Sequence, residues 1–140
     1  MILVVDASVA IKWFLHFREG EDYCQRALEI LARVDEGRAV MVQPPHFLAE
    51  MGAVLAREKP ADALSDLRDL MAVEFESVTE PVVYESACKL ALRLGQHLFD
   101  TLYHAVALHT PGATLVTADK RYFRRAKDVG RIALLADVAL

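Results

Sequence analysis

Four acidic residues occupy positions where a folded protein rarely places a carboxylate without a chemical use for it. Asp6 and Asp119 follow apolar, strand-like runs, and Asp100 precedes a helical pattern. Glu50 lies on the apolar side of another helical pattern. Carboxylates that gather at one place repel each other and lose hydration unless a cation lies between them. A hard divalent metal ion with oxygen ligands meets that need, so the pattern indicates a metal-dependent hydrolase of phosphodiesters.

The three aspartates also have a simpler explanation. Asp6, Asp100 and Asp119 each stand before a segment with helical character. An aspartate at this position commonly caps the helix by accepting hydrogen bonds from its first backbone N–H groups. The aspartates taken alone are therefore compatible with three helix caps.

Glu50 favours the chemical explanation. In a helix it shares a face with Phe47 and Val54. Glutamate is almost never fully buried without a partner, because an unpaired buried carboxylate must either lose free energy or stay protonated. The alternatives are an ion pair with Arg57 or Lys59, or a helix rotated so that Glu50 faces solvent.

Two hydroxyl residues accompany the acids. Ser8 lies two residues after Asp6, and Thr117 lies two residues before Asp119. Hydroxyl groups at such positions orient a carboxylate or a metal-bound water. Ordinary turn and capping chemistry explains them equally well.

A basic cluster begins directly after Asp119 and occupies residues 120–131 of a chain whose net charge is −4. Lys120 and Arg121 are the members nearest the acids, and Lys12 is a further candidate. Such a cluster favours contact with a phosphate backbone beside the metal. The alternative is a solvated helix face.

The pattern of the chain predicts a single α/β domain over residues 1–140, in three layers. Alternation of strands with helices favours a mainly parallel sheet. Ile2–Val5 and Ala113–Thr117 are almost wholly apolar, so we expect them to be neighbouring central strands. The other expected strands are residues 39–42, 74–78 and 131–135. The expected helices are residues 8–14, 21–36, 46–57, 60–72, 81–94, 101–109 and 120–129.

Composition excludes several classes of protein. Hydrophobic residues make up 54% and charged residues 26%, so the chain is neither disordered nor a membrane protein. The N-terminal residues lack a basic leader, and the two cysteines are isolated. We therefore expect a cytoplasmic protein with no membrane association. The histidines have no zinc-like spacing, and there is no glycine-rich phosphate loop.

Four segments carry these residues, and together they resemble the motifs of the PIN-domain family, most closely its VapC-type toxins from prokaryotic toxin–antitoxin pairs. The resemblance spans nearly the whole chain in the family's order. Two departures are Ala53, where family members often have Asn, and Thr101, where Ala is frequent. The segments are VVDASVAIKW with Asp6 and Ser8, AEMGAVL with Glu50, FDTLYHAVAL with Asp100, and LVTADKRYFRRAK with Thr117 and Asp119.

The resemblance implies a PIN-like fold with a five-stranded parallel sheet between helices, and a metal-dependent endoribonuclease acting as a toxin. It also implies a homodimer and a cognate antitoxin that blocks the site. We expect one or two Mg²⁺ or Mn²⁺ ions held by Asp6 and Asp100, with Glu50 and Asp119 as further ligands or as residues that orient bound water. The ions would activate a water for attack on an RNA phosphodiester.

Two other functions remain open. One is a PIN-like binding module that has lost catalysis, although all four acids are present. The other is a metal-dependent phosphatase of the haloacid-dehalogenase type, which would need an aspartate where Ser8 stands. The aromatic residues Trp13, Phe14 and Phe17 predict a surface for a protein partner, consistent with an antitoxin segment.

Overall fold

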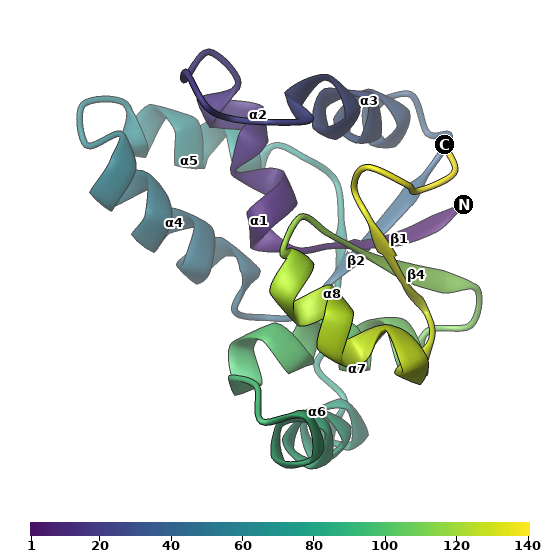
Figure 1. Ribbon diagram of the computed structural model, residues 1–140. Coiled ribbons are helices and arrows are strands. Elements are labelled where there is room, and N and C mark those ends of the chain that lie inside the picture. Colours follow the sequence, from purple (N-terminus) through teal and green to yellow (C-terminus); the bar gives the residue numbers. More distant parts are fainter.

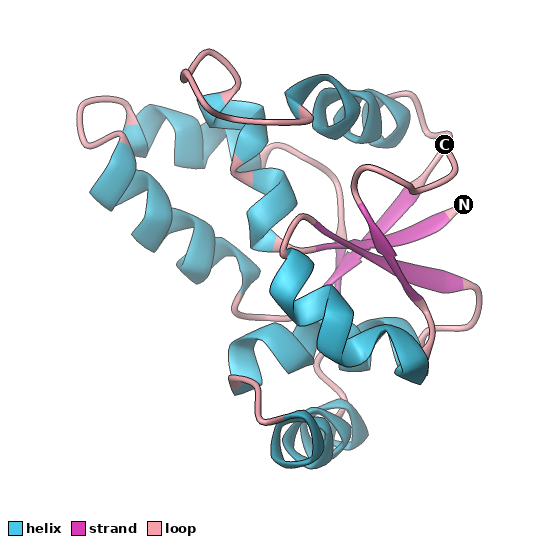
Figure 2. Cartoon of the chain, viewed as in Figure 1, coloured by secondary structure: helices cyan, strands magenta, loops and turns pink.

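Five parallel strands form one sheet in the order β3-β2-β1-β4-β5 (Figures 1 and 2). The computed structural model describes residues 1–140. The expected parallel sheet is confirmed, and β1 and β4 are neighbours as predicted, paired along the whole length of β1. The strands are β1 (Ile2–Val5), β2 (Val40–Gln43), β3 (Glu76–Ser77), β4 (Ala113–Thr117) and β5 (Ile132–Leu134).

Helices cover both faces of this sheet, which confirms the three-layer α/β architecture (Figure 1). On one face α7 packs against β1, β2 and β4, and α6 packs against α7. No helix has the length and apolar character needed to cross a membrane. The helices are α1 (Ala7–Ala10), α2 (Lys12–Leu15), α3 (Cys24–Asp35), α4 (Phe47–Glu58), α5 (Ala63–Met71), α6 (Pro81–Leu94), α7 (Leu98–His109) and α8 (Lys120–Ala126), followed by a 3₁₀ turn at Lys127–Val129.

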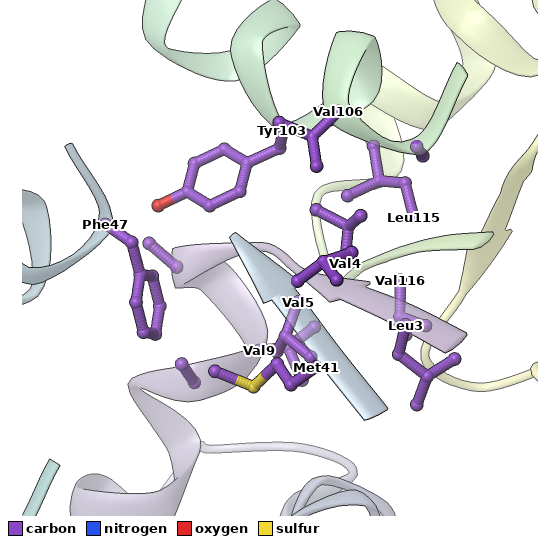
Figure 3. Close-up of a cluster of buried hydrophobic side chains, with 14 of the residues drawn as sticks. Leu3, Val4, Val5, Val9, Met41, Phe47, Tyr103, Val106, Leu115 and Val116 are labelled. Atoms are coloured by element: carbon purple, nitrogen blue, oxygen red, sulfur yellow. The ribbon is translucent and has the colours of Figure 1, made fainter. Parts of the chain in front are cut away.

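The central strands are buried on both faces, as their apolar sequences require. Val4 and Val5 of β1 and Val116 of β4 are fully inaccessible to solvent. Phe47 of α4 and Tyr103 of α7 pack into the same cluster (Figure 3). Burial of each large side chain contributes about 1.5–3 kcal/mol, so this cluster is the main support for the strand ends that carry the acids.

A buried glutamine completes the end of β1. The side-chain Oε1 of Gln43 accepts a hydrogen bond from the backbone N–H of Val5 at 2.8 Å. The Nε2 of Gln43 donates to the carbonyl of Val5, also at 2.8 Å. The β1–β2 register pairs only Ile2 with Val40 and Leu3 with Met41. The Gln43 amide therefore takes the place of strand-to-strand hydrogen bonds immediately before Asp6.

Element boundaries differ from the sequence prediction in several places. The largest consequence is at α7, which begins at Leu98 instead of residue 101 because His97 caps it, its ring accepting from the N–H of Phe99. The helix expected over 21–36 begins only at Cys24, since Tyr23 has a left-handed backbone with φ of 58°. The segment 8–14 forms two short helices, segment 60–72 is helical from Ala63, and segment 120–129 ends in a 3₁₀ turn. The other strand and helix limits agree with the expected ones or differ from them by one or two residues.

Candidate active site

The four acids lie along one edge of the structure, where β1 and β4 end and α4 and α7 begin. Asp6 follows β1, and Asp119 lies two residues beyond the end of β4. Glu50 and Asp100 each lie in the first turn of a helix. The N-terminus of a helix carries partial positive charge, which favours carboxylates at this position. Parallel strands thus bring together residues that are far apart in the sequence.

Asp6 is held by two hydroxyl groups. Ser8 Oγ donates to the Asp6 carboxylate at 2.5 Å, and Thr117 Oγ1 donates to the same oxygen at 2.9 Å. Each hydroxyl also accepts a backbone hydrogen bond, Ser8 from the N–H of Ala118 and Thr117 from the N–H of Asp119. The Asp6 side chain makes no capping hydrogen bond to α1, so the helix-cap explanation is wrong for Asp6.

The carboxylates influence one another electrostatically. The pKa of Asp6 is raised to about 6, chiefly by burial and to a smaller extent by the charges of Glu50 and Asp100, against the lowering effect of its two hydroxyl partners. The pKa of Asp100 is also raised, first by burial and then by the charges of Glu50 and Asp119. These acids therefore ionise at an energetic cost that a nearby cation would offset.

Glu50 is held by residues that the sequence analysis did not identify. The hydroxyl of Tyr103, on α7, donates to the Glu50 carboxylate at 3.0 Å. Nε2 of His46 lies 3.2 Å from the same carboxylate oxygen. Two spacings point to these residues, since His46 is four residues before Glu50 and Tyr103 is three residues after Asp100, on the same helical faces.

The two basic residues considered as partners of Glu50 are engaged elsewhere. Arg57 pairs with Glu58 at 3.1 Å, and Lys59 pairs with Asp66 at 2.7 Å. Glu50 is also not turned fully to solvent, because its side chain is only 26% exposed. Both alternatives for Glu50 are therefore wrong, and it faces the acidic edge.

The remaining two aspartates differ from each other. Asp119 does cap its helix, because its Oδ1 accepts from the N–H of Tyr122 at 3.0 Å. Asp100 lies inside α7, so the cap explanation is wrong for that residue. His104, four residues after Asp100, is buried and bonds to the hydroxyl of Tyr122 and the carbonyl of Gly130, so it has a structural role.

The acids form an oxygen-rich edge but not a closed ligand cage. No group of three or more His, Cys, Asp or Glu side chains is arranged to hold a metal ion. The expected convergence of all four carboxylates on one point is therefore not seen. The physical reason is local, since Asp6, Glu50 and Asp119 are each held by their own hydrogen-bond partners. Asp6 and Asp100 are partly buried carboxylates whose pKa values are raised by burial and by neighbouring acids, and such groups nevertheless fit a hard divalent ion that keeps several waters.

The three basic residues considered for phosphate binding differ in their exposure to solvent. Lys120 and Arg121 are exposed at the start of α8, directly after Asp119. Lys12 is buried, and its ammonium pairs with Glu21 at 2.9 Å. The structure therefore leaves Lys120 and Arg121 available to a phosphate, whereas the charge of Lys12 is already neutralised.

The fold is a three-layer α/β fold with an all-parallel sheet, and carboxylates lie at the ends of its adjacent strands β1 and β4. The sequence pattern described as the PIN domain matches residues 3–129, and the chain belongs to the PIN domain family. No curated protein sequence matches the chain.

Solved structures with a similar fold include two described as VapBC. The chain matches VapBC-1 from nontypeable Haemophilus influenzae with a TM-score of 0.64 and 17% identity, over 98% of this chain and 100% of that one. It matches VapBC2 from Rickettsia felis, a structure with a bound DNA fragment from the promoter, with a TM-score of 0.62 and 18% identity, over 96% of this chain and 97% of that one. It matches PAE2754 from Pyrobaculum aerophilum with a TM-score of 0.67 and 18% identity, over 97% of this chain and 90% of that one. At these identities the likeness shows a shared fold.

Proposed function

We propose that the chain is a metal-dependent endoribonuclease and the toxin of a toxin–antitoxin pair. The observation that carries the proposal is the Asp6 carboxylate, which Ser8 and Thr117 hold at the end of β1. Its pKa is raised first by burial and then by the charges of Glu50 and Asp100. A carboxylate kept partly buried among other carboxylates is typical of a catalytic site. Membership of the PIN domain family supports a nuclease, and the similarity to VapBC structures supports the toxin role.

Asp6 and Asp100 would hold one or two Mg²⁺ or Mn²⁺ ions, with Glu50 and Asp119 completing the site. When bound, such ions make water more acidic and offset negative charge on the phosphate. Ser8 and Thr117 would keep the Asp6 carboxylate ionised and fixed in direction. The hydroxyl of Tyr103 would fix the direction of the Glu50 carboxylate.

Outside this acidic edge, Lys120 and Arg121 would bind a phosphate that flanks the cleaved bond. They lie at the first turn of α8, next to Asp119 in the sequence. Contacts of this kind position the RNA without reading its sequence.

The test of the proposal is cleavage of RNA by the purified protein. We expect end-labelled single-stranded RNA to be cut internally in the presence of Mg²⁺ or Mn²⁺, to stay intact in excess EDTA, and to be cut again when metal is restored. Cleavage that continues unchanged in EDTA would contradict the metal-dependent chemistry. RNA binding without cleavage under every metal tested would instead favour the catalytically silent PIN-like module.

A groove between α3 and α5 is the candidate antitoxin site. Two cavities of 510 and 340 Å³ share Leu31, Asp69 and Val73 in their walls. The second cavity extends to Trp13 and Phe17 of the predicted partner surface. Trp13 is buried, but Phe17 is 68% exposed, so the aromatic group is not enclosed in the core.

The composition of this groove indicates what would fill it. Its walls are largely apolar, and Asp35, Asp69 and Glu74 add acidic groups. Asp66 lies further along but is already paired with Lys59. An apolar segment flanked by basic residues has the matching chemistry, and we propose that the antitoxin supplies it.

Phe17→Asp tests this docking site. We expect the variant to bind the antitoxin on the order of tenfold more weakly, because a charge replaces an apolar anchor in a shared groove. RNA cleavage by the free toxin should not change, since Phe17 contacts His16 and Lys59 and lines a cavity whose walls include none of the four acids. Isothermal titration calorimetry with the purified antitoxin measures the affinity. The matched control is Leu92→Asp, at an 81% exposed apolar position on α6. Equal weakening by both variants would argue against the groove.

The proposal also includes a homodimer in the cytoplasm. Both features rest on the resemblance to VapC-type toxins. Analytical ultracentrifugation of the free protein tests whether it is a homodimer, and cell fractionation tests whether it is cytoplasmic.

A further inference from the structure

Phe99 is an exposed aromatic residue beside the acidic edge. Its side chain is 51% exposed, and it directly precedes Asp100 in the first turn of α7. Exposed apolar side chains are common singly, but this one has a supporting structure around it that an incidental surface residue does not need.

Two histidines fix the backbone of Phe99. Its N–H donates to Nδ1 of His97 at 3.1 Å. Its carbonyl accepts from Nε2 of His46 at 3.0 Å. Because His46 lies before α4 and His97 before α7, the residue is held from two separate parts of the chain.

The same two histidines also contact the Phe99 ring. The ring centroids of Phe99 and His97 are 4.8 Å apart, and those of Phe99 and His46 are 5.1 Å apart. The ring centroid of His46 lies 4.9 Å from that of Tyr103, and Tyr103 is fully buried. The Phe99 ring therefore rests on a row of rings that is anchored in the core, so its direction is fixed before any ligand arrives.

This row of rings is joined to the acids. His46 Nε2 lies 3.2 Å from the Glu50 carboxylate, and the hydroxyl of Tyr103 donates to the same group. Nδ1 of His46 is buried without a hydrogen-bond partner, so ring stacking and the Nε2 contacts hold this side chain in place. A ligand that contacts Phe99 is thus adjacent to the carboxylates.

We propose that Phe99, supported by His46 and His97, is a stacking platform for an unpaired base of the RNA substrate, next to the phosphodiester that is cleaved. The inference rests on the proposed ribonuclease function and names the contact that holds the nucleotide. Proteins bind single-stranded RNA by stacking its bases on aromatic rings, and such stacking tolerates any base because every base has an aromatic face. The site therefore selects unpaired RNA rather than a particular sequence.

A binding measurement on a cleavage-silent background tests the platform. In protein carrying Asp6→Asn, Phe99→Leu should weaken the Kd for fluorescein-labelled single-stranded RNA by about 5- to 150-fold, the loss expected for one stacked base. Phe99→Tyr keeps an aromatic face and should bind within about twofold of the parent. The Leu92→Ala variant on α6 removes an exposed apolar side chain elsewhere and should have no effect.

The kinetic counterpart separates binding from chemistry. With Asp6 intact, Phe99→Leu should raise KM and leave kcat nearly unchanged, because a stacked base is bound equally in the ground and transition states. Equal RNA affinity of the Leu and Tyr variants would overturn the inference. A change in dimer formation or antitoxin affinity with unchanged RNA affinity would also overturn it and assign Phe99 to a protein interface. If the parent protein neither binds nor cleaves RNA, the proposed function fails together with the platform.

Discussion

Asp6→Asn should abolish RNA cleavage in a protein that remains folded. The asparagine keeps the size of the side chain and can still accept hydrogen bonds from Ser8 and Thr117. It removes the negative charge that a divalent ion requires, so we expect activity to fall by more than about 100-fold, the loss reached by removing residues that merely orient a metal ligand. Cleavage assays with Mg²⁺ or Mn²⁺ measure the loss, and circular dichroism checks the fold. Activity near that of the wild type would exclude Asp6 from the reaction.

The same variant should be more stable than the wild type when metal is removed. The native pKa of Asp6 is about 6, against 3.8 without the protein environment, so the folded chain binds the proton more tightly than the unfolded chain. The wild-type protein therefore gains stability from this group as the pH falls from neutral through about 6 towards 4. Above that range the ionised carboxylate destabilises the fold, and the asparagine has no such charge.

Thermal unfolding in EDTA at two pH values measures this effect. The excess stability of Asp6→Asn should be largest near pH 7 and should shrink towards pH 4, where Asp6 is protonated in the folded state and its protonation in the unfolded state has begun. A variant that is less stable than the wild type at pH 7 would show that the Asp6 carboxylate supports the fold.

Gln43→Leu should produce a large loss of stability. Leucine has a similar volume, but it leaves the N–H and the carbonyl of Val5 buried without partners. Each unsatisfied group costs about 1–3 kcal/mol, so the free energy of unfolding should fall by about 2–6 kcal/mol. Small domains are stable by only about 5–15 kcal/mol, so this is a large share of the total.

Denaturant unfolding followed by circular dichroism measures that loss. The matched control is Gln25→Leu, at an exposed position of α3, which should change stability by less than about 0.5 kcal/mol. Equal unfolding midpoints for the two variants would show that the Gln43 hydrogen bonds do not contribute to stability.

The sequence was most informative where periodicity or chain breakers decide the structure. Ile2–Val5 and Ala113–Thr117 are apolar runs with clear ends, and Pro81–Leu94 is bounded by Pro81 and Gly95, so their limits agree with the prediction. The start of α7 was missed because histidine is not among the usual capping residues.

Side-chain contacts between distant elements were beyond the reach of the sequence pattern. The placement of the acids follows from parallel topology, because parallel strands end on one edge. The hydrogen bond from Tyr103 to Glu50 and the pairing of Lys12 with Glu21 depend instead on how a helix or a loop packs. Periodicity indicates which face is buried, but not which polar group meets another across the interface.

The hydroxyls of Ser8 and Thr117 make the acidic edge part of the rigid framework. Each donates to Asp6 and accepts from a backbone N–H in the turn that joins β4 to α8. This turn can therefore open only when Asp6 releases both hydroxyls, and Asp6 itself is bonded through its N–H to Val116 of the central sheet. Its local unfolding is thereby coupled to the unfolding of the sheet, so we expect the backbone amides of the segment carrying Asp119 to exchange slowly with solvent, as one cooperative unit with the sheet, although the segment is a surface turn.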